Sequence, residues 1–249
     1  MSLRGLWLAT QFLSRLPVPN VKDFSPRDLS RSAPWFPFVG LVLGALVTGV
    51  IVFTRFEGPL LAAAVGVLAW TWLTGALHLD GLADLTDAMG AAHGNPDRFL
   101  AVLSDPHVGS FGVVSIVLAL LLKFAALAQL GLDALLAAPL VLAWARLGPL
   151  CWSRWLAPLK PGQGERFAWS LSLGWIVLWT AVLSAASAAL MPSLCVAPIV
   201  IALWGVWLHY RVGGVTGDCL GAGVEVVEIV LLATLALSGN LGAPLRMLF

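Results

Sequence analysis

Three aspartates recur within a short stretch of this chain at a spacing that suits metal chemistry. Asp80, Asp84 and Asp87 lie four and then three residues apart, so in a helix they share one face. Three carboxylates so close together repel one another unless a cation compensates them. Hard oxygen ligands of this kind suit magnesium or manganese. Residues 78–90 therefore predict a divalent metal site, with a hydrated acidic helix end as the alternative.

A glycine-rich turn lies much later in the chain, within residues 211–228. Gly213, Gly214 and Gly217 permit a tight turn whose exposed backbone N–H groups can cradle phosphate oxygens. The alternative is that these glycines only allow neighbouring helices to pack closely. The turn is therefore a candidate phosphate-binding element.

Acidic residues continue along the same stretch at helical spacing. Asp218, Glu225 and Glu228 follow one another at intervals of seven and three residues, and the two glutamates begin an apolar run. Ionisable groups in such a run are costly, and they are functional candidates for that reason. The alternative is structural, because Glu225 can pair with Arg146 or Lys123, which also fall within apolar runs.

A short loop between the two acidic stretches holds Asp105 and His107. Asp105 is a candidate metal ligand or base, and His107 is a candidate proton acceptor near neutral pH, although a single loop histidine is more often simply hydrated. His78 stands two residues before Asp80, so it points elsewhere on an ideal helix and can orient a carboxylate.

Basic residues follow in a later loop. Arg154, Lys160 and Arg166 suit the binding of substrate phosphates, either as guanidinium forks or as point charges. The alternative is that they only signal the orientation of the chain in a membrane.

Membrane helices must position these polar groups. Of the 249 residues, 59% are hydrophobic and 11% are charged, and the mean hydropathy is +0.92. About a quarter of the residues in a typical soluble domain are charged, so this much more apolar composition predicts a membrane protein. Seven apolar runs are long enough to span a bilayer. They cover residues 35–53, 60–77, 111–130, 134–152, 168–190, 194–209 and 224–238.

The N-terminal stretch, residues 3–16, mixes Leu and Trp with Arg4, Gln11 and Arg15. This mixture predicts a helix that lies in the membrane interface, ended by Pro17. The expected fold class is thus all-α, a polytopic membrane helix bundle of about seven spans. It forms one integral-membrane domain over residues 1–249, with residues 1–33 as a cytoplasmic or interfacial segment.

The distribution of Lys and Arg predicts the orientation of the chain, because basic residues are retained in the cytoplasm during insertion. Alternate loops hold ten of them on one side: Arg4, Arg15, Lys22, Arg27, Arg31, Arg98, Arg154, Lys160, Arg166 and Arg211. The opposite side holds Arg55 and Arg246. We therefore expect a multi-pass protein of the cell (inner) membrane whose active site faces the cytoplasm.

Charge and cysteine content exclude other classes. A net charge of +1 supplies no basic surface for nucleic acid. Cys151, Cys195 and Cys219 are odd in number and lack CxxC spacing, which supports neither a disulfide framework nor a thiolate zinc site.

Four motifs, in order, resemble the cobalamin synthase family, also called adenosylcobinamide-GDP ribazoletransferase, an integral-membrane enzyme of the late corrinoid pathway. They are FLSRLPVP at residues 12–19, HLDGLAD at 78–84, Asp105 with Gly109 and Phe111-Gly112, and Gly213-Gly214 with TGD at 216–218 and LGA at 220–222. The acidic motif also resembles that of CDP-alcohol phosphotransferases. The chain departs from the family pattern at Pro106-His107 and in residues 158–160, which leaves the expected metal ligands intact.

The resemblance implies a magnesium-dependent transfer. The ribose 3′-hydroxyl of α-ribazole, or of its 5′-phosphate, attacks the corrinoid-linked phosphorus of adenosylcobinamide-GDP, and GMP leaves. Adenosylcobalamin or its phosphate is the product. Mg²⁺ is the expected cofactor, held by Asp80, Asp84, Asp87 and Asp218.

The other expected site residues combine the residue chemistry described above with this resemblance. Besides Asp84 and Asp87, the candidate catalytic residues are Asp105, Glu225 and Glu228, one of which takes the hydroxyl proton. The expected substrate contacts are Arg15, His78, Arg154, Lys160, Arg211, Gly214, Thr216 and Gly217.

The expected partners are the two small-molecule substrates and membrane lipid, with a homo-oligomer or an association with other corrinoid-pathway enzymes as further alternatives. A CDP-alcohol-type phosphatidyltransferase, an ion-coupled membrane transporter and a membrane scaffold are the competing hypotheses.

Overall fold

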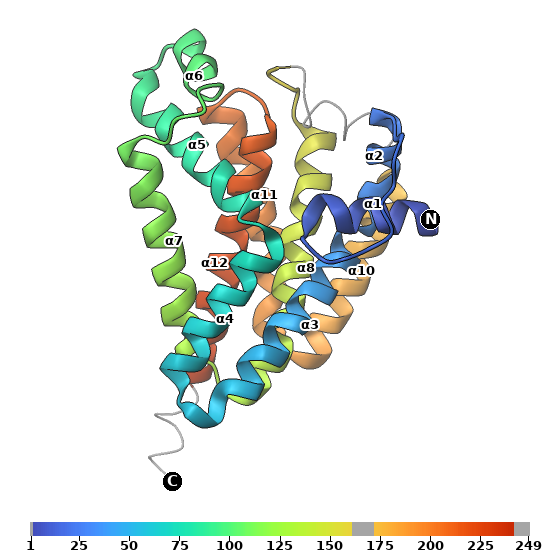
Figure 1. The fold of residues 1–249 in the computed structure, drawn as a ribbon, viewed down its shortest axis with the longest axis vertical. Helices are drawn as coiled ribbons and strands as arrows, with labels where there is room; N and C mark the ends of the chain where they lie inside the picture. The colour runs from blue at the N-terminus through green and yellow to red at the C-terminus, as the bar shows by residue number, and fades with distance from the viewer. Residues whose placement is uncertain (1, 161–171, 242–249) are drawn as a thin grey trace.

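The computed structural model describes residues 2–160 and 172–241, which form a bundle of helices (Figure 1). The helices are α1 (Leu3–Leu13), α2 (Pro26–Ser32), η1 (Ala33–Trp35), α3 (Phe36–Thr54), η2 (Arg55–Glu57), α4 (Pro59–Thr74), α5 (Leu77–Ala92), α6 (Pro96–Val102), α7 (Ser110–Gln129), α8 (Leu132–Trp155), α10 (Leu173–Leu190), η3 (Pro192–Val196), α11 (Ala197–Arg211) and α12 (Gly217–Leu241). Within the described ranges no strand forms, and the all-α prediction is confirmed.

Six stretches of helix are long and apolar enough to cross a membrane, and a bent pair makes up to seven. The six are Arg27–Glu57, Ser110–Gln129, Leu132–Trp155, Leu173–Leu190, Pro192–Arg211 and Gly217–Gly239. The prediction of about seven spans is therefore confirmed. Residues 168–171 of the predicted fifth span lie outside the described residues, as do Glu165, Arg166 and Arg246.

The helices divide into a packed centre and an apolar outer surface. On α8, Ala143, Trp144 and Ala145 are completely buried. On α7, by contrast, Val114 is 56% exposed and Leu121 is 56% exposed. Apolar side chains of this kind would be costly in water, so an outer surface that presents them is suited to lipid.

The expected second span is broken. Residues 60–77 were predicted as one helix, but Gly75 and Ala76 both adopt left-handed backbone angles, with φ of +63° and +59°. The chain bends there by 87°, so that α4 ends at Thr74 and the acidic stretch forms the separate helix α5. The span prediction was wrong at this end because a backbone bend leaves little trace in hydropathy.

The N-terminal helix supports this bend. Figure 1 shows α1 lying across the long helices. It ends at Leu13, earlier than Pro17, and the backbone N–H of Arg15 then donates to the Leu73 carbonyl over 2.8 Å. This bond satisfies a carbonyl near the end of α4 that the break in the helix would leave unpaired.

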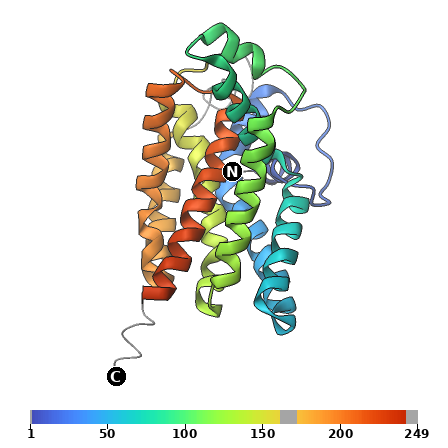
Figure 2. The same cartoon turned by 90° about the vertical axis from the view of Figure 1, so that its left-hand side faces the viewer.

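The C-terminal helix joins the rest of the bundle together. α12 packs against α5, α7, α8 and α11, and the quarter-turn view shows α7, α12 and α11 side by side (Figure 2). The N-terminal end of α12 meets α5 near the end of the bundle that also carries α6, at the top of Figure 1.

Candidate active site

The site begins where α5 and α12 touch without side chains between them. A Cβ on Gly81 would lie 2.9 Å from the carbonyl oxygen of Asp218, and one on Gly221 would lie 3.5 Å from the Cα of His78. Only glycine permits the first approach, because real Cβ atoms essentially never come that close. The contact brings the acidic face of α5 beside Asp218.

A cavity of about 330 Å³ opens at this crossing. Its polar wall is formed by His78, Asp80, Lys160 and Asp218. The rest of its lining comes from α1, α3 and α8 and from further residues of α5 and α12. The remaining lining residues are Phe12, Leu13, Phe36, Leu77, Gly81, Pro149, Gly217, Leu220 and Gly221. The predicted contacts His78, Lys160 and Gly217 thus share one cavity with two of the predicted metal ligands.

The glycine-rich turn places Lys160 over this cavity. Val215 pairs with the loop that follows α8: its N–H donates to Ala157 over 2.9 Å, and its carbonyl accepts from Leu159 over 3.0 Å. A Cβ on Gly214 would lie 2.5 Å from the Ala157 carbonyl oxygen, so the pairing requires glycine there. Gly214 therefore serves the docking of two loops.

The ammonium group of Lys160 lies 3.7 Å from Asp218 and donates to the carbonyl of Leu103 over 3.3 Å. Thr216 caps α12, because its hydroxyl accepts from the N–H of Cys219 over 3.3 Å. The predicted substrate contact Thr216 thus has a local structural task.

The three other predicted basic contacts are placed apart from the first cavity. Arg15 runs alongside Gly75 at the bend, where a Cβ would lie 2.7 Å from its Nε. Arg154 is exposed at the end of α8. Arg211, at the end of α11, lines a second cavity.

Asp84 lies in a field of negative charge. It is partly buried, and the carboxylates of Asp80, Asp218 and Asp87 all act on it, while Lys160 opposes them. Within residues 2–160 and 172–241 its side chain accepts no hydrogen bond, so both oxygens are open. Such a carboxylate group calls for a cation.

The carboxylate oxygens of this site are of the type that magnesium prefers, but their geometry limits how many can bind one ion. Among the described residues, no three His, Cys, Asp or Glu side chains converge closely enough to hold a metal ion by themselves. Magnesium, however, is commonly bound by one or two carboxylates together with substrate phosphates and water. The open oxygens of Asp80 and Asp84, beside Asp218, are suited to that mode.

Asp87 faces a different set of partners. One of its oxygens accepts from the N–H of Gly109 over 2.7 Å and the other from the N–H of Gly112 over 2.9 Å. These N–H groups begin α7, so the buried carboxylate caps that helix from α5. We therefore interpret Asp87 as the residue that fixes α5 against α7, which differs from the role of metal ligand expected for it.

This interpretation predicts the effect of Asp87→Asn. An amide offers one acceptor where two N–H groups need partners, and it turns an NH₂ group toward one of them. The free energy of unfolding should fall by about 1–3 kcal/mol, the usual cost of an unsatisfied buried group. Thermal unfolding of the purified protein measures this change. A protein of unchanged stability that has lost only metal affinity would contradict the capping role.

Asp105 is exposed and already engaged. Hydrogen bonds from the backbone N–H and the ring of His107, at 3.0 and 2.7 Å, lower the pKa of Asp105. A carboxyl with a lowered pKa is a weaker base. Asp105 also does not line the first cavity, and both observations weaken the expectation that it takes the hydroxyl proton.

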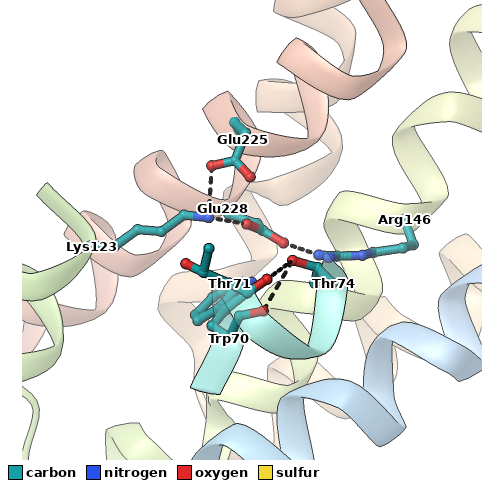
Figure 3. A network of polar contacts seen from close by, with 7 residues as sticks. All are labelled: Trp70, Thr71, Thr74, Lys123, Arg146, Glu225 and Glu228. Carbon is teal, nitrogen blue, oxygen red and sulfur yellow. Dashed lines mark hydrogen bonds and ion pairs between the residues drawn. The ribbon is translucent and has the colours of Figure 1, made fainter. Parts of the chain in front are cut away.

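Glu225 and Glu228 belong to a separate, buried ion cluster (Figure 3). Glu228 pairs with Arg146 of α8 and with Lys123 of α7, and Lys123 lies 2.7 Å from Glu225. Lys123 also sits over the Trp70 ring, 4.6 Å from its centre. All four charged side chains are at most 5% exposed.

The ion cluster is remote from the acids of the first cavity. Glu225 and Glu228 lie seven and ten residues beyond Asp218, roughly 10 and 15 Å along α12 at the helical rise. The alternative weighed from the sequence, pairing of Glu225 with Lys123, is what the structure contains. The geometry therefore favours a structural role for both glutamates over the expected role as bases.

Sequence reasoning missed the apolar part of the site. Phe12, Phe36 and Pro149 line the first cavity from α1, α3 and α8. Each is one of many apolar residues in its helix, and only the tertiary packing distinguishes it. Of these, Phe12 alone stood in a motif of the family resemblance.

Comparison with known proteins gives a consistent result. The family model described as Cobalamin-5-phosphate synthase (CobS) matches residues 5–236. An adenosylcobinamide-GDP ribazoletransferase of Thiobacillus denitrificans is 49% identical over 244 residues, which cover 95% of this chain and 97% of the relative. The enzyme of the same name from Novosphingobium aromaticivorans is 46% identical over 95% of this chain and 98% of the relative. No solved structure matches the chain at a significant level.

Proposed function

The chain belongs to the cobalamin-5-phosphate synthase family, and from this premise we propose how its polar residues divide the work of the reaction. The protein is a multi-pass membrane enzyme with cobalamin synthase activity, acting in cobalamin biosynthesis on corrinoid substrates. Neither the phosphatidyltransferase nor the transporter alternative gains support from the relatives.

The reaction proposed is a displacement at phosphorus. The ribose 3′-hydroxyl oxygen of α-ribazole, or of its 5′-phosphate, forms a bond to the corrinoid-linked phosphorus of adenosylcobinamide-GDP. The bond between that phosphorus and the oxygen of GMP breaks, and the hydroxyl proton passes to a base. Little covalent chemistry falls to the protein, so positioning and neutralisation of charge must supply most of the rate.

Asp80, Asp84 and Asp218 are the proposed magnesium ligands. Asp80 of α5 and Asp218 of α12 are supported by the first cavity, which both line. Asp84 is supported by the charges of these two carboxylates, which act on it, and by the absence of a hydrogen bond to it among the described residues. A bound magnesium ion would neutralise the diphosphate and the departing GMP. Lys160, half-buried on the same wall, is placed to pair with a phosphate oxygen as a point charge.

Asp84 is also the proposed proton acceptor. Glu225 and Glu228 are held in the ion cluster, and Asp105 is bound to His107, which leaves the acids of α5 as the carboxylates near the reacting groups. His78, buried and on the wall of the cavity, would orient the substrate or a carboxylate.

The proposed location is the cell inner membrane, with the first cavity facing the cytoplasm. The support is the count of basic residues on the loops at the same end as the cavity, and the nucleotide substrate, which is a cytoplasmic metabolite class. Contact with lipid is proposed for the exposed apolar surface of α7.

The decisive experiment is release of GMP by the purified protein. With adenosylcobinamide-GDP and either acceptor, we expect GMP in step with product, complete loss of release on chelation, and recovery on addition of magnesium. Full activity in excess chelator would contradict the magnesium proposal alone. Release of CMP from a CDP-alcohol, with none of GMP, would instead favour a phosphatidyltransferase.

A further inference from the structure

A second cavity lies further along α5 from the first. It has a volume of about 450 Å³ and is bordered by the end of α5, by α6 and by the end of α11. Its lining is largely apolar and includes Met89, Phe99 and Tyr210, together with Arg211. Its size falls within the range of small-molecule sites.

The two cavities open onto the same stripe of α5. Gly81 and Ala92 are eleven residues apart, which is close to three helical turns, so they lie on one face. Gly81 lines the first cavity and Ala92 the second. The loop after α8 borders both, because Leu159 lines the second cavity and Lys160 the first.

Asp84 lies between the two cavities along α5. It precedes Met89 by five residues and follows Asp80 by four, which correspond to roughly 7.5 and 6 Å of helical rise. Asp84 lines neither cavity, but it lies within about two helical turns of the α5 residues that line each of them. A transferase that joins two substrates needs such an arrangement.

The lining of the second cavity suits an apolar aromatic base. None of the described residues that line it is acidic. Asn95 lines it too, but its side-chain oxygen is occupied, since it accepts from the N–H groups of Asp97 and Arg98 over 2.9 and 3.1 Å. His93 and Tyr210 are the other described lining side chains with a nitrogen or oxygen acceptor, so the mostly apolar lining favours a base with fewer N–H donors than guanine. Tyr210, which is 79% exposed, instead offers a face for stacking.

Arg211 adds a site for an anion. In the described part of the chain its guanidinium makes no hydrogen bond and no ion pair, although it stands at the wall of the second cavity. An unpaired guanidinium is the preferred group for a phosphate in proteins.

We propose that the second cavity binds the acceptor nucleoside, with its aromatic base against Tyr210 and Phe99 and a 5′-phosphate on Arg211. The proposal rests on the proposed function. It places the acceptor in the second cavity and the diphosphate of the donor in the first. It also makes Arg211 the residue that determines preference between α-ribazole 5′-phosphate and α-ribazole.

Arg211→Gln tests the phosphate contact. The KM for α-ribazole 5′-phosphate should rise by about tenfold, the effect of losing one charge-assisted hydrogen bond. The KM for α-ribazole should change by less than about twofold, and so should the KM for adenosylcobinamide-GDP. Steady-state GMP release with each acceptor measures all three. Arg98→Gln, an exposed arginine of α6 that lines neither cavity, is the matched control.

Tyr210→Ala tests the base contact, and its exposed position makes misfolding unimportant. The KM should rise by about fivefold or more for both acceptors, the magnitude of a lost base-stacking contact. A rise confined to the donor KM in either variant would show that the cavity takes the nucleotide of the donor and would overturn the proposal, as would no change in any KM. If the unmodified protein released no GMP with either acceptor, the proposed function itself would fail.

Discussion

Asp84→Asn should abolish measurable GMP release, a loss of at least about three orders of magnitude in kcat. Asp84 is the partly buried carboxylate on which the charges of Asp80, Asp87 and Asp218 converge, and its oxygens carry no hydrogen bond from the described residues. An amide neither ligates magnesium well nor accepts the hydroxyl proton. Electrostatic stabilisation by a bound metal supplies several kcal/mol, and each 1.36 kcal/mol is tenfold in rate.

The variant should still insert into the membrane and fold, because removal of one of several like charges relieves repulsion. Its midpoint of thermal unfolding should therefore equal or exceed that of the unmodified protein. Asp133→Asn is the matched control: Asp133 is exposed in the first turn of α8, at the end remote from the first cavity, and turnover should be normal. Near-normal turnover of Asp84→Asn would remove this residue from the site.

The acidic face of α5 was predictable because it depends only on the spacing of residues within one helix. Asp80, Asp84 and Asp87 share a face whenever the stretch is helical, and the helix does form over Leu77–Ala92. The membrane spans were predictable for a similar reason, since each needs only a long apolar run. Periodicity and hydropathy within one segment carried both predictions.

The partners of these residues were not predictable in the same way. Asp87 looks equivalent to Asp84 in sequence, yet it meets the N-terminus of α7, which lies more than twenty residues later. The bend at Gly75 and Ala76 turns α5 toward that helix, and the left-handed angle of Ala76 is one that alanine rarely adopts. Gly75 is a local signal for the end of α4, because glycine favours the left-handed C-cap position, but nothing in the sequence indicated that Ala76 would adopt the same angle.

The two glutamates of α12 show most clearly what the sequence alone could not predict. The sequence identified Glu225 and Glu228 as costly groups in an apolar run, which is correct, but cost alone does not distinguish a base from an ion pair. The distinction depends on whether Lys123 and Arg146 face α12. That depends on how α7 and α8 pack around it, as Figure 3 shows.

Glu228→Gln should lower the free energy of unfolding by about 3–5 kcal/mol, the range for breaking a buried ion pair from one side. Glu228 is completely buried and contacts both Arg146 and Lys123. Its loss leaves two cations with only Glu225 in an apolar interior, and Arg146 already has its Nε and one terminal nitrogen without a hydrogen bond in the described residues. Thermal unfolding in detergent measures the loss. Glu57→Gln, at an exposed acid of η2, should leave stability unchanged.

A charge-balanced variant separates the ion cluster from catalysis. Lys123→Met combined with Glu225→Met removes one cation and one anion, and leaves the pair of Arg146 and Glu228 in place. Because apolar residues can replace a buried pair at little cost, this double variant should lose much less stability than the sum of its two single changes.

Folded Glu228→Gln, assayed well below its unfolding midpoint, should still release GMP at a rate within about tenfold of normal. A variant of normal stability without GMP release would instead make Glu228 a catalytic residue, because a purely structural pair cannot stop the chemistry and leave the fold intact.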